Sequence, residues 1–180
     1  MGAGPFAEIP FGCRDCKLTP WNGATLGSAV DLPRIRTVEI SVTSDSTDLD
    51  GDDVRIATHS FAKGLEGSIE AGGINIAALA VLESGTFTPS GTAPSRKITY
   101  KVLGDQAQKY FKLEAQMYGD DSGDIHLIAW KVKATSGPNY SFTQGEFALT
   151  ACDLGGIFDE TVTPSRLYDI VQNETITPIV

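Results

Sequence analysis

The sequence has little basic charge, with 14 Lys and Arg against 23 Asp and Glu and a formal net charge of −9. This balance argues against a surface that grips nucleic acid, because such surfaces need clustered Lys and Arg to displace counterions. It does not exclude a surface past which nucleic acid travels without sticking. The sequence also lacks an apolar run of the roughly 18 residues that a membrane-spanning helix needs. The N-terminal MGAGPFAEIPFG lacks the basic and continuous apolar segments of a signal peptide, so we expect a cytoplasmic start and no membrane partner.

Cysteine and histidine are too scarce for a metal or redox site. Cys13 and Cys16 form a CxxC, but no second cysteine pair or histidine pair follows, and His59 and His126 stand alone. No strand-to-helix pattern surrounds the CxxC, as a redox motif would require. The GxSxG, P-loop, HExxH and GxGxxG motifs are absent too. We therefore expect reduced structural thiols, no metal, no cofactor and no enzymatic activity.

Alternation of apolar and polar residues recurs along the chain and indicates β-strands. The clearest hairpin joins Tyr110–Met117 to Ile125–Ala134 through the turn GDDSG, whereas 86–95 reads as a Thr/Ser/Pro/Gly loop. The repeated succession of strands and turns, together with one helix, predicts a mainly β fold: an antiparallel β-sandwich or barrel with one flanking α-helix. The other expected strands are Arg34–Thr43, Val54–Ile69, Lys97–Val102, Tyr140–Cys152 (with Phe147 and Leu149 inward) and Leu167–Val171.

The chain divides at about residue 33. Residues 1–33 are rich in Gly, Pro and small residues, which predicts an extended N-terminal arm with little structure of its own. Phe6, Ile9, Phe11 and Trp21 would be costly to leave in water, so an arm that docks on a neighbour is one interpretation. Residues 34–180 then form the β domain.

One helix is expected, after a corner at Gly72-Gly73 and before Gly85 as its C′ residue. Further apolar residues lie away from its main stripe, so the helix needs a second layer of its own fold or a neighbouring subunit. Its apolar stripe, which we predict to lie at a subunit interface, is Ile74, Ala77, Ala78, Val81 and Leu82.

An acidic stretch, SDSTDLDGDD, follows the first expected strand. An EF-hand calcium loop counted from Asp48 would need Gly at Asp53 and Glu at His59, so the match fails. A solvated acidic turn is the interpretation that remains. Its carboxylates are Asp45, Asp48, Asp50, Asp52 and Asp53.

Several ordered segments together resemble a known family. They are GLEGSIEAGGINIAALAVLESGT, KYFKLEAQMYGDDSGDIHLIAWKVKA, GEFALTACD and LYDIVQNET, within residues 34–176. They resemble the tail tube (major tail) proteins of long-tailed bacteriophages, particularly those of actinobacteria. The resemblance implies a β-sandwich flanked by a helix, six copies of which join edge to edge into a ring with a β-barrel as its inner wall.

The resemblance also implies a place and partners. The rings would stack in the virion tail, assembled in the host cytoplasm, around a tape-measure protein and between tail terminator and tail tip proteins. Viral DNA would later pass through without specific binding. Tail tube proteins have no catalytic residues, so the resemblance implies none in this chain. The alternative function is a β-sandwich module of a virion that binds carbohydrate or a receptor.

Two further expectations follow from the tube. The N-terminal arm and the acidic turn at 45–53 are candidates for loops that bridge rings. The hairpin Tyr110–Met117 with Ile125–Lys133 is the candidate for the wall, although Lys131 and Lys133 fit a purely acidic lumen poorly. Either face of the sheet could line the lumen. The outward-facing residues of this hairpin, which are the candidates for the lumen wall, are Lys112, Glu114 and Gln116.

Overall fold

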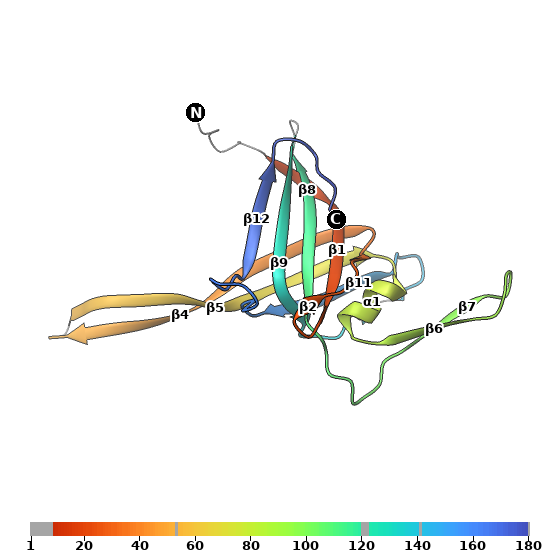
Figure 1. Ribbon diagram of the computed structural model, residues 1–180, viewed down its shortest axis with the longest axis horizontal. Coiled ribbons are helices and arrows are strands. Elements are labelled where there is room, and N and C mark those ends of the chain that lie inside the picture. Colours follow the sequence, from red (N-terminus) through yellow and green to blue (C-terminus); the bar gives the residue numbers. More distant parts are fainter. Residues whose placement is uncertain (1–8, 53, 120–122, 141, 180) are drawn as a thin grey trace.

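Strands make up most of the computed structural model, which describes residues 9–52, 54–119, 123–140 and 142–179 (Figure 1). The prediction of a mainly β, antiparallel fold with one short helix is confirmed. The elements are β1 (Pro10–Asn22), β2 (Thr25–Leu26), β3 (Val30–Asp31), β4 (Ile35–Gly51), β5 (Val54–Gly72), α1 (Ile76–Leu82), β6 (Thr86–Ser90), β7 (Lys97–Lys101), β8 (Phe111–Gly119), β9 (Asp124–Ala134), β10 (Asn139–Tyr140), β11 (Leu149–Gly156) and β12 (Tyr168–Asn173).

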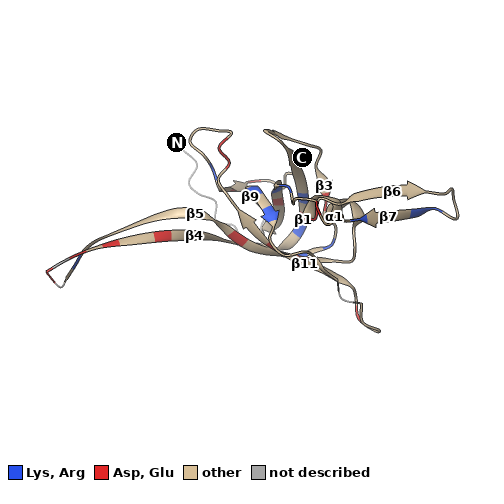
Figure 2. Ribbon diagram, turned by 90° about the horizontal axis from the view of Figure 1, so that it is seen from below, with Lys and Arg blue, Asp and Glu red and all other residues tan. Residues whose placement is uncertain are grey.

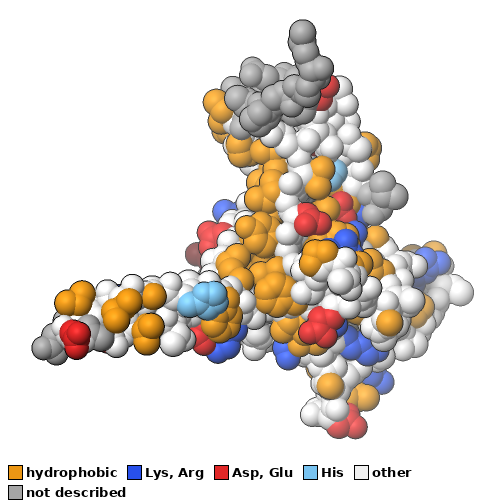
Figure 3. Space-filling view, turned by 60° about the vertical axis from the view of Figure 1, so that its left-hand side comes forward, with side chains coloured by type: hydrophobic (Ala, Val, Ile, Leu, Met, Phe, Trp, Pro, Cys, Tyr) orange, Lys and Arg blue, Asp and Glu red, His pale blue; other side chains and the backbone are white. Residues whose placement is uncertain are grey.

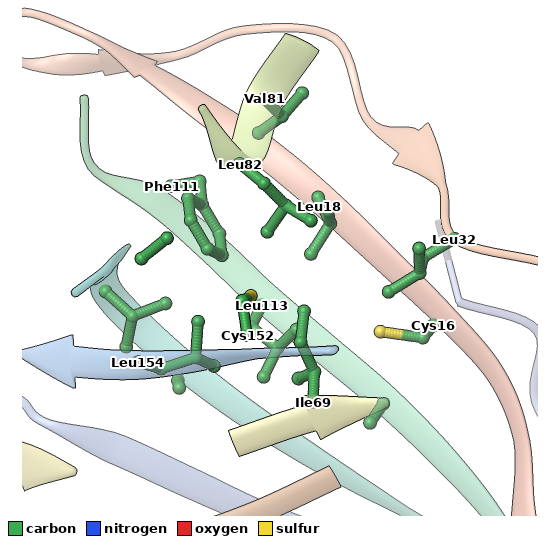
Figure 4. Packing of buried hydrophobic residues seen from close by; sticks show 14 of the residues in the cluster. Cys16, Leu18, Leu32, Ile69, Val81, Leu82, Phe111, Leu113, Cys152 and Leu154 are labelled. Carbon is green, nitrogen blue, oxygen red and sulfur yellow. The ribbon is translucent and has the colours of Figure 1, made fainter. Parts of the chain in front are cut away.

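The main sheet runs in the order β2-β1-β8-β9-β11-β5-β4 and divides at β9. One edge of β9 pairs with β8, while the other pairs first with β12 and then, over its last residues, with β11. The strands around β8 and the strands around β5 therefore cross as two layers (Figure 1). The apolar side chains between them form the core (Figure 4), which includes Leu18, Ile69, Leu82, Phe111, Leu113, Cys152 and Leu154.

The N-terminal region differs from the unstructured arm that its composition predicted. Strand β1 lies inside the main sheet and pairs with β8 over most of its length, for example Leu18 with Leu113. Cys16 and Leu18 are fully buried, and the Trp21 indole nitrogen donates to the Trp130 carbonyl oxygen at 2.8 Å. The expectation is wrong for Pro10–Asn22 because their alternate side chains complete the core. Phe6 lies outside the described residues, and Ile9 and Phe11 are exposed.

The helix is present but shorter than its apolar stripe suggested. Asn75 caps it, since its side-chain oxygen accepts from the backbone nitrogens of the second and third following residues. Ile74 therefore lies before the helix. At the other end Ser84, with φ 57°, takes the left-handed conformation expected of Gly85. Gly85 is needed for space instead, because a Cβ there would lie 2.4 Å from the Tyr100 hydroxyl oxygen.

Two local predictions are wrong. The segment expected as a loop after the helix contains β6, which pairs with β7 to form a separate two-stranded hairpin. Phe147, expected to point inward, precedes β11 and is 95% exposed. The predicted strands at Lys97–Val102, Tyr110–Met117, Ile125–Ala134 and Leu167–Val171 correspond to β7, β8, β9 and β12.

Candidate assembly surfaces

The acidic stretch lies in the outer part of the long β4–β5 hairpin, which projects from one end of the molecule (Figure 1). Asp45, Asp48 and Asp50 are strand residues, and Asp52 has a positive φ at the tip, so the expected acidic turn is wrong for the first three. Asp53 lies outside the described residues. Asp is uncommon in strands, but an exposed hairpin tolerates it because both faces are in contact with water.

The outer part of this hairpin has two different faces. Residues directly opposite each other in an antiparallel pair share a face, and Asp45 pairs with Phe61 while Leu49 pairs with Ala57. That face carries the exposed apolar side chains. The opposite face carries the pairs Asp48–Thr58 and Asp50–Arg55, with Arg55 bonded to Asp48 at 2.8 Å.

The chain's own core cannot cover the apolar face of the outer hairpin. Nearer the body, even-numbered β4 residues such as Val38 and Ile40 pack against the core. From Thr37 to Leu49 the strand pairs without a skipped β4 residue, so Leu49 points to the side away from the core. Figure 3 shows the apolar side chains gathered on the hairpin far from the body. The exposed members are Leu49 (60%), Val54 (65%) and Phe61 (50%), and the exposed Ile56 (66%) is the unpaired residue at the bulge between the Leu49 and Asp50 pairs.

The β6–β7 hairpin projects from the opposite end of the molecule (Figure 1). Tyr100 fixes its base, because its hydroxyl lies 3.0 Å from the Leu79 carbonyl oxygen and 2.9 Å from a Glu83 carboxylate oxygen and shares its single proton between these two acceptors. Burial, and then the bonded Glu83 carboxylate, raise the pKa of Tyr100, so it remains a neutral donor. The hairpin is therefore held in place at the C-terminal end of α1.

Strand edges and apolar surface remain open in the described chain. Within the described ranges β4 pairs only with β5, and β12 only with β9. Between them lies a groove whose apolar lining is Val38, Ile40, Met117, Leu127 and Ile170. Figure 3 shows a column of apolar side chains on the body of the molecule. Free edges and uncovered apolar surface of this extent favour pairing with another chain.

The helix stripe does not form such a surface. Ala78, Val81 and Leu82 belong to the core of their own chain, where α1 packs against β1, β3 and β6. The prediction of a subunit interface is wrong for these three residues, since their own fold supplies the second layer. Ile74 is exposed and Ala77 is half-buried, so only these two members of the stripe keep surface for a neighbour.

The predicted lumen residues are also covered. Glu114 and Gln116 are 8% and 3% exposed, so the expectation that they face outward is wrong. The polar face of β8 and β9 lies beneath the C-terminal segment: the Gln116 amide donates to the Thr177 carbonyl oxygen at 3.0 Å. Lys112 is bonded to Glu114 at 2.7 Å and is largely buried itself.

Asp124 is the centre of this buried polar cluster. Its carboxylate accepts hydrogen bonds from the Thr177 backbone nitrogen (2.8 Å), Gln116, the Asn173 amide (2.8 Å) and, across 3.1 Å, the His126 ring. Burial alone would raise the pKa of Asp124, but these bonds together outweigh it and lower the pKa to about 2. The carboxylate is therefore ionised and holds the C-terminal segment against β8 and β9.

The thiols are free, as predicted. Burial, above all, raises the pKa of Cys13 to about 11 and that of Cys152 to about 12, and it raises the pKa of Cys16 as well. These thiols are therefore protonated and weak nucleophiles. Among the residues that the structure describes, no three His, Cys, Asp or Glu side chains gather as ligands for a metal. No helix in the same residues has the length and apolar character to cross a membrane.

Sequence reasoning missed the β6–β7 hairpin. Its signal was the alternation Phe87, Pro89 in one strand and Ile98, Tyr100 in the other, which places all four on one face. The Thr, Ser, Pro and Gly between them obscured the first strand. The role of the C-terminal segment had no local signal, because Thr177 is more than fifty residues from Asp124.

Comparisons with known proteins add a likeness of fold. No protein-family model matches the chain, and no curated protein matches it. Among solved structures it is similar to a chain in the cryo-EM structure of the anti-feeding prophage baseplate, 6-fold symmetrised. The TM-score is 0.47 at 6% sequence identity, and the match covers 95% of this chain and 97% of that chain. A likeness at this level concerns the course of the chain and not what the chain does.

Proposed function

We propose that this protein is a structural subunit of a phage tail tube, which assembles into stacked, hexameric rings that form a conduit for DNA. The observation that carries the proposal is the outer β4–β5 hairpin, with its apolar face directed away from the chain's own core. The segments that resemble tail tube proteins include this hairpin's inner part, the helix and β8–β9.

The hairpin is costly to leave exposed. Four large apolar side chains there are at least half exposed, and burying the remainder of each is worth about 1 kcal/mol. Covering them on a neighbour would therefore contribute on the order of 4 kcal/mol per subunit. A second chain can supply that cover, whereas the hairpin's own body lies on the other side of the ribbon.

The proposed role is mechanical rather than catalytic. The subunit's partners are further copies of itself, a tape-measure protein inside the tube, and terminator and tip proteins at its ends. Its location is the virion tail, assembled in the host cytoplasm. With a formal charge of −9, the protein offers passing DNA few places to bind. The burial of Glu114 and Gln116 removes them from the proposed wall of the conduit.

The alternative module that binds carbohydrate has less support. Such modules present exposed aromatic platforms, whereas Trp21 is buried and the Trp130 ring is covered by the Arg166 guanidinium, 3.1 Å from its centroid. Trp130 also donates to Asp169 at 2.8 Å, which fixes its ring.

Negative-stain electron microscopy of the purified protein over a range of concentrations tests the proposal. We expect rings or tubes of uniform diameter with a central channel. A protein that sediments as a monomer at every concentration, and that does not enter tail particles when supplied to an assembly reaction, would refute it. A glycan array tests the alternative, for which we expect no binding.

A further inference from the structure

The two projecting hairpins carry opposite charge. Residues 44–62 of the β4–β5 hairpin contain five Asp and one Arg, a formal charge of −4. Residues 86–103 of the β6–β7 hairpin contain Arg96, Lys97 and Lys101 and no acidic residue, a formal charge of +3. Figure 2 shows the acidic residues on β4 at one end of the molecule and the basic residues on β7 at the other.

Each hairpin carries a pair of like charges on one face and apolar side chains on the other. In β6–β7 the pairs Phe87–Tyr100 and Pro89–Ile98 share one face, while Lys97 and Lys101 lie on the other with Ser and Thr. In the outer β4–β5 hairpin Asp48 and Asp50 likewise share one face, whereas Leu49 lies on the other face together with Phe61 and its partner Asp45. The two ribbons therefore match in the arrangement of their faces and are complementary in charge.

Both ribbons also have unpaired edges. Among the described strands, β7 pairs only with β6, and the outer part of β4 pairs only with β5. Pro89 removes a backbone donor from β6, so β7 is the better edge for a new partner. None of Arg96, Lys97 and Lys101 has a carboxylate within ion-pair distance in the part of the chain that the structure describes.

We propose that the β7 edge of one copy pairs with the outer β4 edge of the next copy, so that the two hairpins join into one four-stranded sheet. Lys97 and Lys101 then lie beside Asp48 and Asp50 on one face, and Ile98 lies beside Leu49 on the other, while Tyr100 stays bonded to Leu79 and Glu83 in its own chain. Edge-to-edge pairing meets three requirements at once: backbone donors and acceptors are paired, opposite charges are adjacent, and apolar side chains form one surface.

The contact has a direction. Because the two hairpins lie at opposite ends of the longest axis, they cannot meet within one molecule (Figure 1). A contact between two different surfaces is heterologous, so its repetition generates a closed ring or a filament. The inference uses the proposed function only in that copies of the chain associate; it assigns the strands and charges by which they do so.

Paired charge reversals test the inference. Lys97→Glu with Lys101→Glu makes both hairpins acidic, and Asp48→Lys with Asp50→Lys makes the outer β4 strand basic like β7. All four side chains are exposed or partly exposed, so each variant folds, as circular dichroism checks. Each variant alone then places like charges side by side, and we expect the concentration needed for association, measured by sedimentation velocity, to rise on the order of tenfold or more.

Mixing the two variants is the decisive step. The acidic β7 of one variant faces the basic β4 of the other, and the reverse contact is also complementary, so an equimolar mixture should regain the association of the wild-type protein. The first variant has Lys97→Arg with Lys101→Arg as its control, which keeps the positive charge of β7. The second variant has Glu146→Lys with Glu160→Lys as its control, which replaces two acidic residues by lysine, as Asp48→Lys with Asp50→Lys does, at exposed sites elsewhere. Both controls should associate as the wild-type protein does.

The outcomes separate this inference from the proposed function. If both reversed variants form tubes as the wild-type protein does, or if their mixture does not regain association, the hairpin pairing is overturned. The proposed function as a tube subunit is then unaffected. The wild-type protein could instead form head-to-tail oligomers but no rings or tubes, with association lost in each reversed variant and regained in their mixture. That result would support the hairpin pairing and refute the proposed function as a tube subunit. A wild-type chain that never associates refutes both. Binding of duplex DNA at 150 mM salt, lost on reversal of the two lysines, would assign β7 to nucleic acid instead and overturn the inference.

Discussion

Replacing Asp124 with Asn tests how the C-terminal segment is held. The carboxylate is fully buried and accepts four hydrogen bonds, of which one comes from the Thr177 backbone nitrogen. An amide of the same shape has one acceptor oxygen. Its NH2 group would face either the Asn173 donor, at the Oδ1 position, or the donors from Gln116, His126 and Thr177, at the Oδ2 position. The substitution therefore leaves buried donors without a partner.

The size of the effect follows from these contacts. Hydrogen bonds to a charged group are worth about 1.5–3 kcal/mol each, and breaking a buried charged network costs about 3–5 kcal/mol. Because the surrounding loop can relax in part, we expect Asp124→Asn to lower the free energy of unfolding by about 3 kcal/mol at pH 7. Urea denaturation measures it, and hydrogen exchange should show faster exchange in 175–179.

The effect should depend on pH in one direction. The pKa of Asp124 in the folded protein, about 2, lies below the value of 3.8 for an unperturbed Asp. Its ionised form therefore stabilises the fold above about pH 4, and that contribution, about 2 kcal/mol, is lost as the pH falls through 2. The difference between the wild-type protein and Asp124→Asn should shrink correspondingly between pH 5 and pH 2.

The exposed Asp105→Asn is the matched control and should change stability by less than about 0.5 kcal/mol. The reasoning is refuted if Asp124→Asn unfolds at the same urea concentration as this control and its C-terminal amides keep their protection. It is also refuted if the stability difference does not change between pH 5 and pH 2.

Three other substitutions separate folding from assembly. Gly67→Ala would place a Cβ 2.1 Å from the Glu39 carbonyl oxygen, so we expect urea denaturation to show a loss of 2 kcal/mol or more, against no measurable change for Gly104→Ala, which has open space. Leu82→Ala removes a fully buried side chain and should lower the free energy of unfolding by about 3 kcal/mol. If the free energy of unfolding is unchanged and assembly is lost, the helix packs at a subunit interface instead. Leu49→Ser should leave the urea midpoint within error but weaken association in sedimentation velocity, and unchanged association would show that the apolar hairpin face is not used.

Local alternation was sufficient to predict β8 and β9, because both strands carry a regular apolar face and a Gly-rich turn joins them. It did not predict which polar residues are exposed. Glu114 and Gln116 alternate with the apolar residues of β8, as solvent-exposed strand residues do, but residues near the C-terminus cover them. The sequence around residue 114 contains no sign of this distant contact.

The errors at β1 and at the acidic stretch have a shared cause. Gly and Pro around Cys13 and repeated Asp around Asp48 are both unfavourable in strands, so composition predicted an arm and a turn. Pairing with distant partners overrides these preferences: β1 is held by β8, and the acidic strand by β5. The apolar stripe of α1 was recognised, but periodicity alone does not tell whether a chain or its neighbour covers it.

Among the described strands, only β4 and β5 take part in the ladder from Ser44–Ala62 to Gly51–Val54. A pull along the axis of such a ribbon loads its crosswise hydrogen bonds in shear and divides the load among them, whereas a sideways pull at the tip opens them one after another. If neighbours grip the hairpin along its length, a bent or stretched polymer of this chain would distribute tension over many backbone bonds at every joint. The same ribbon, gripped only at its tip, would peel.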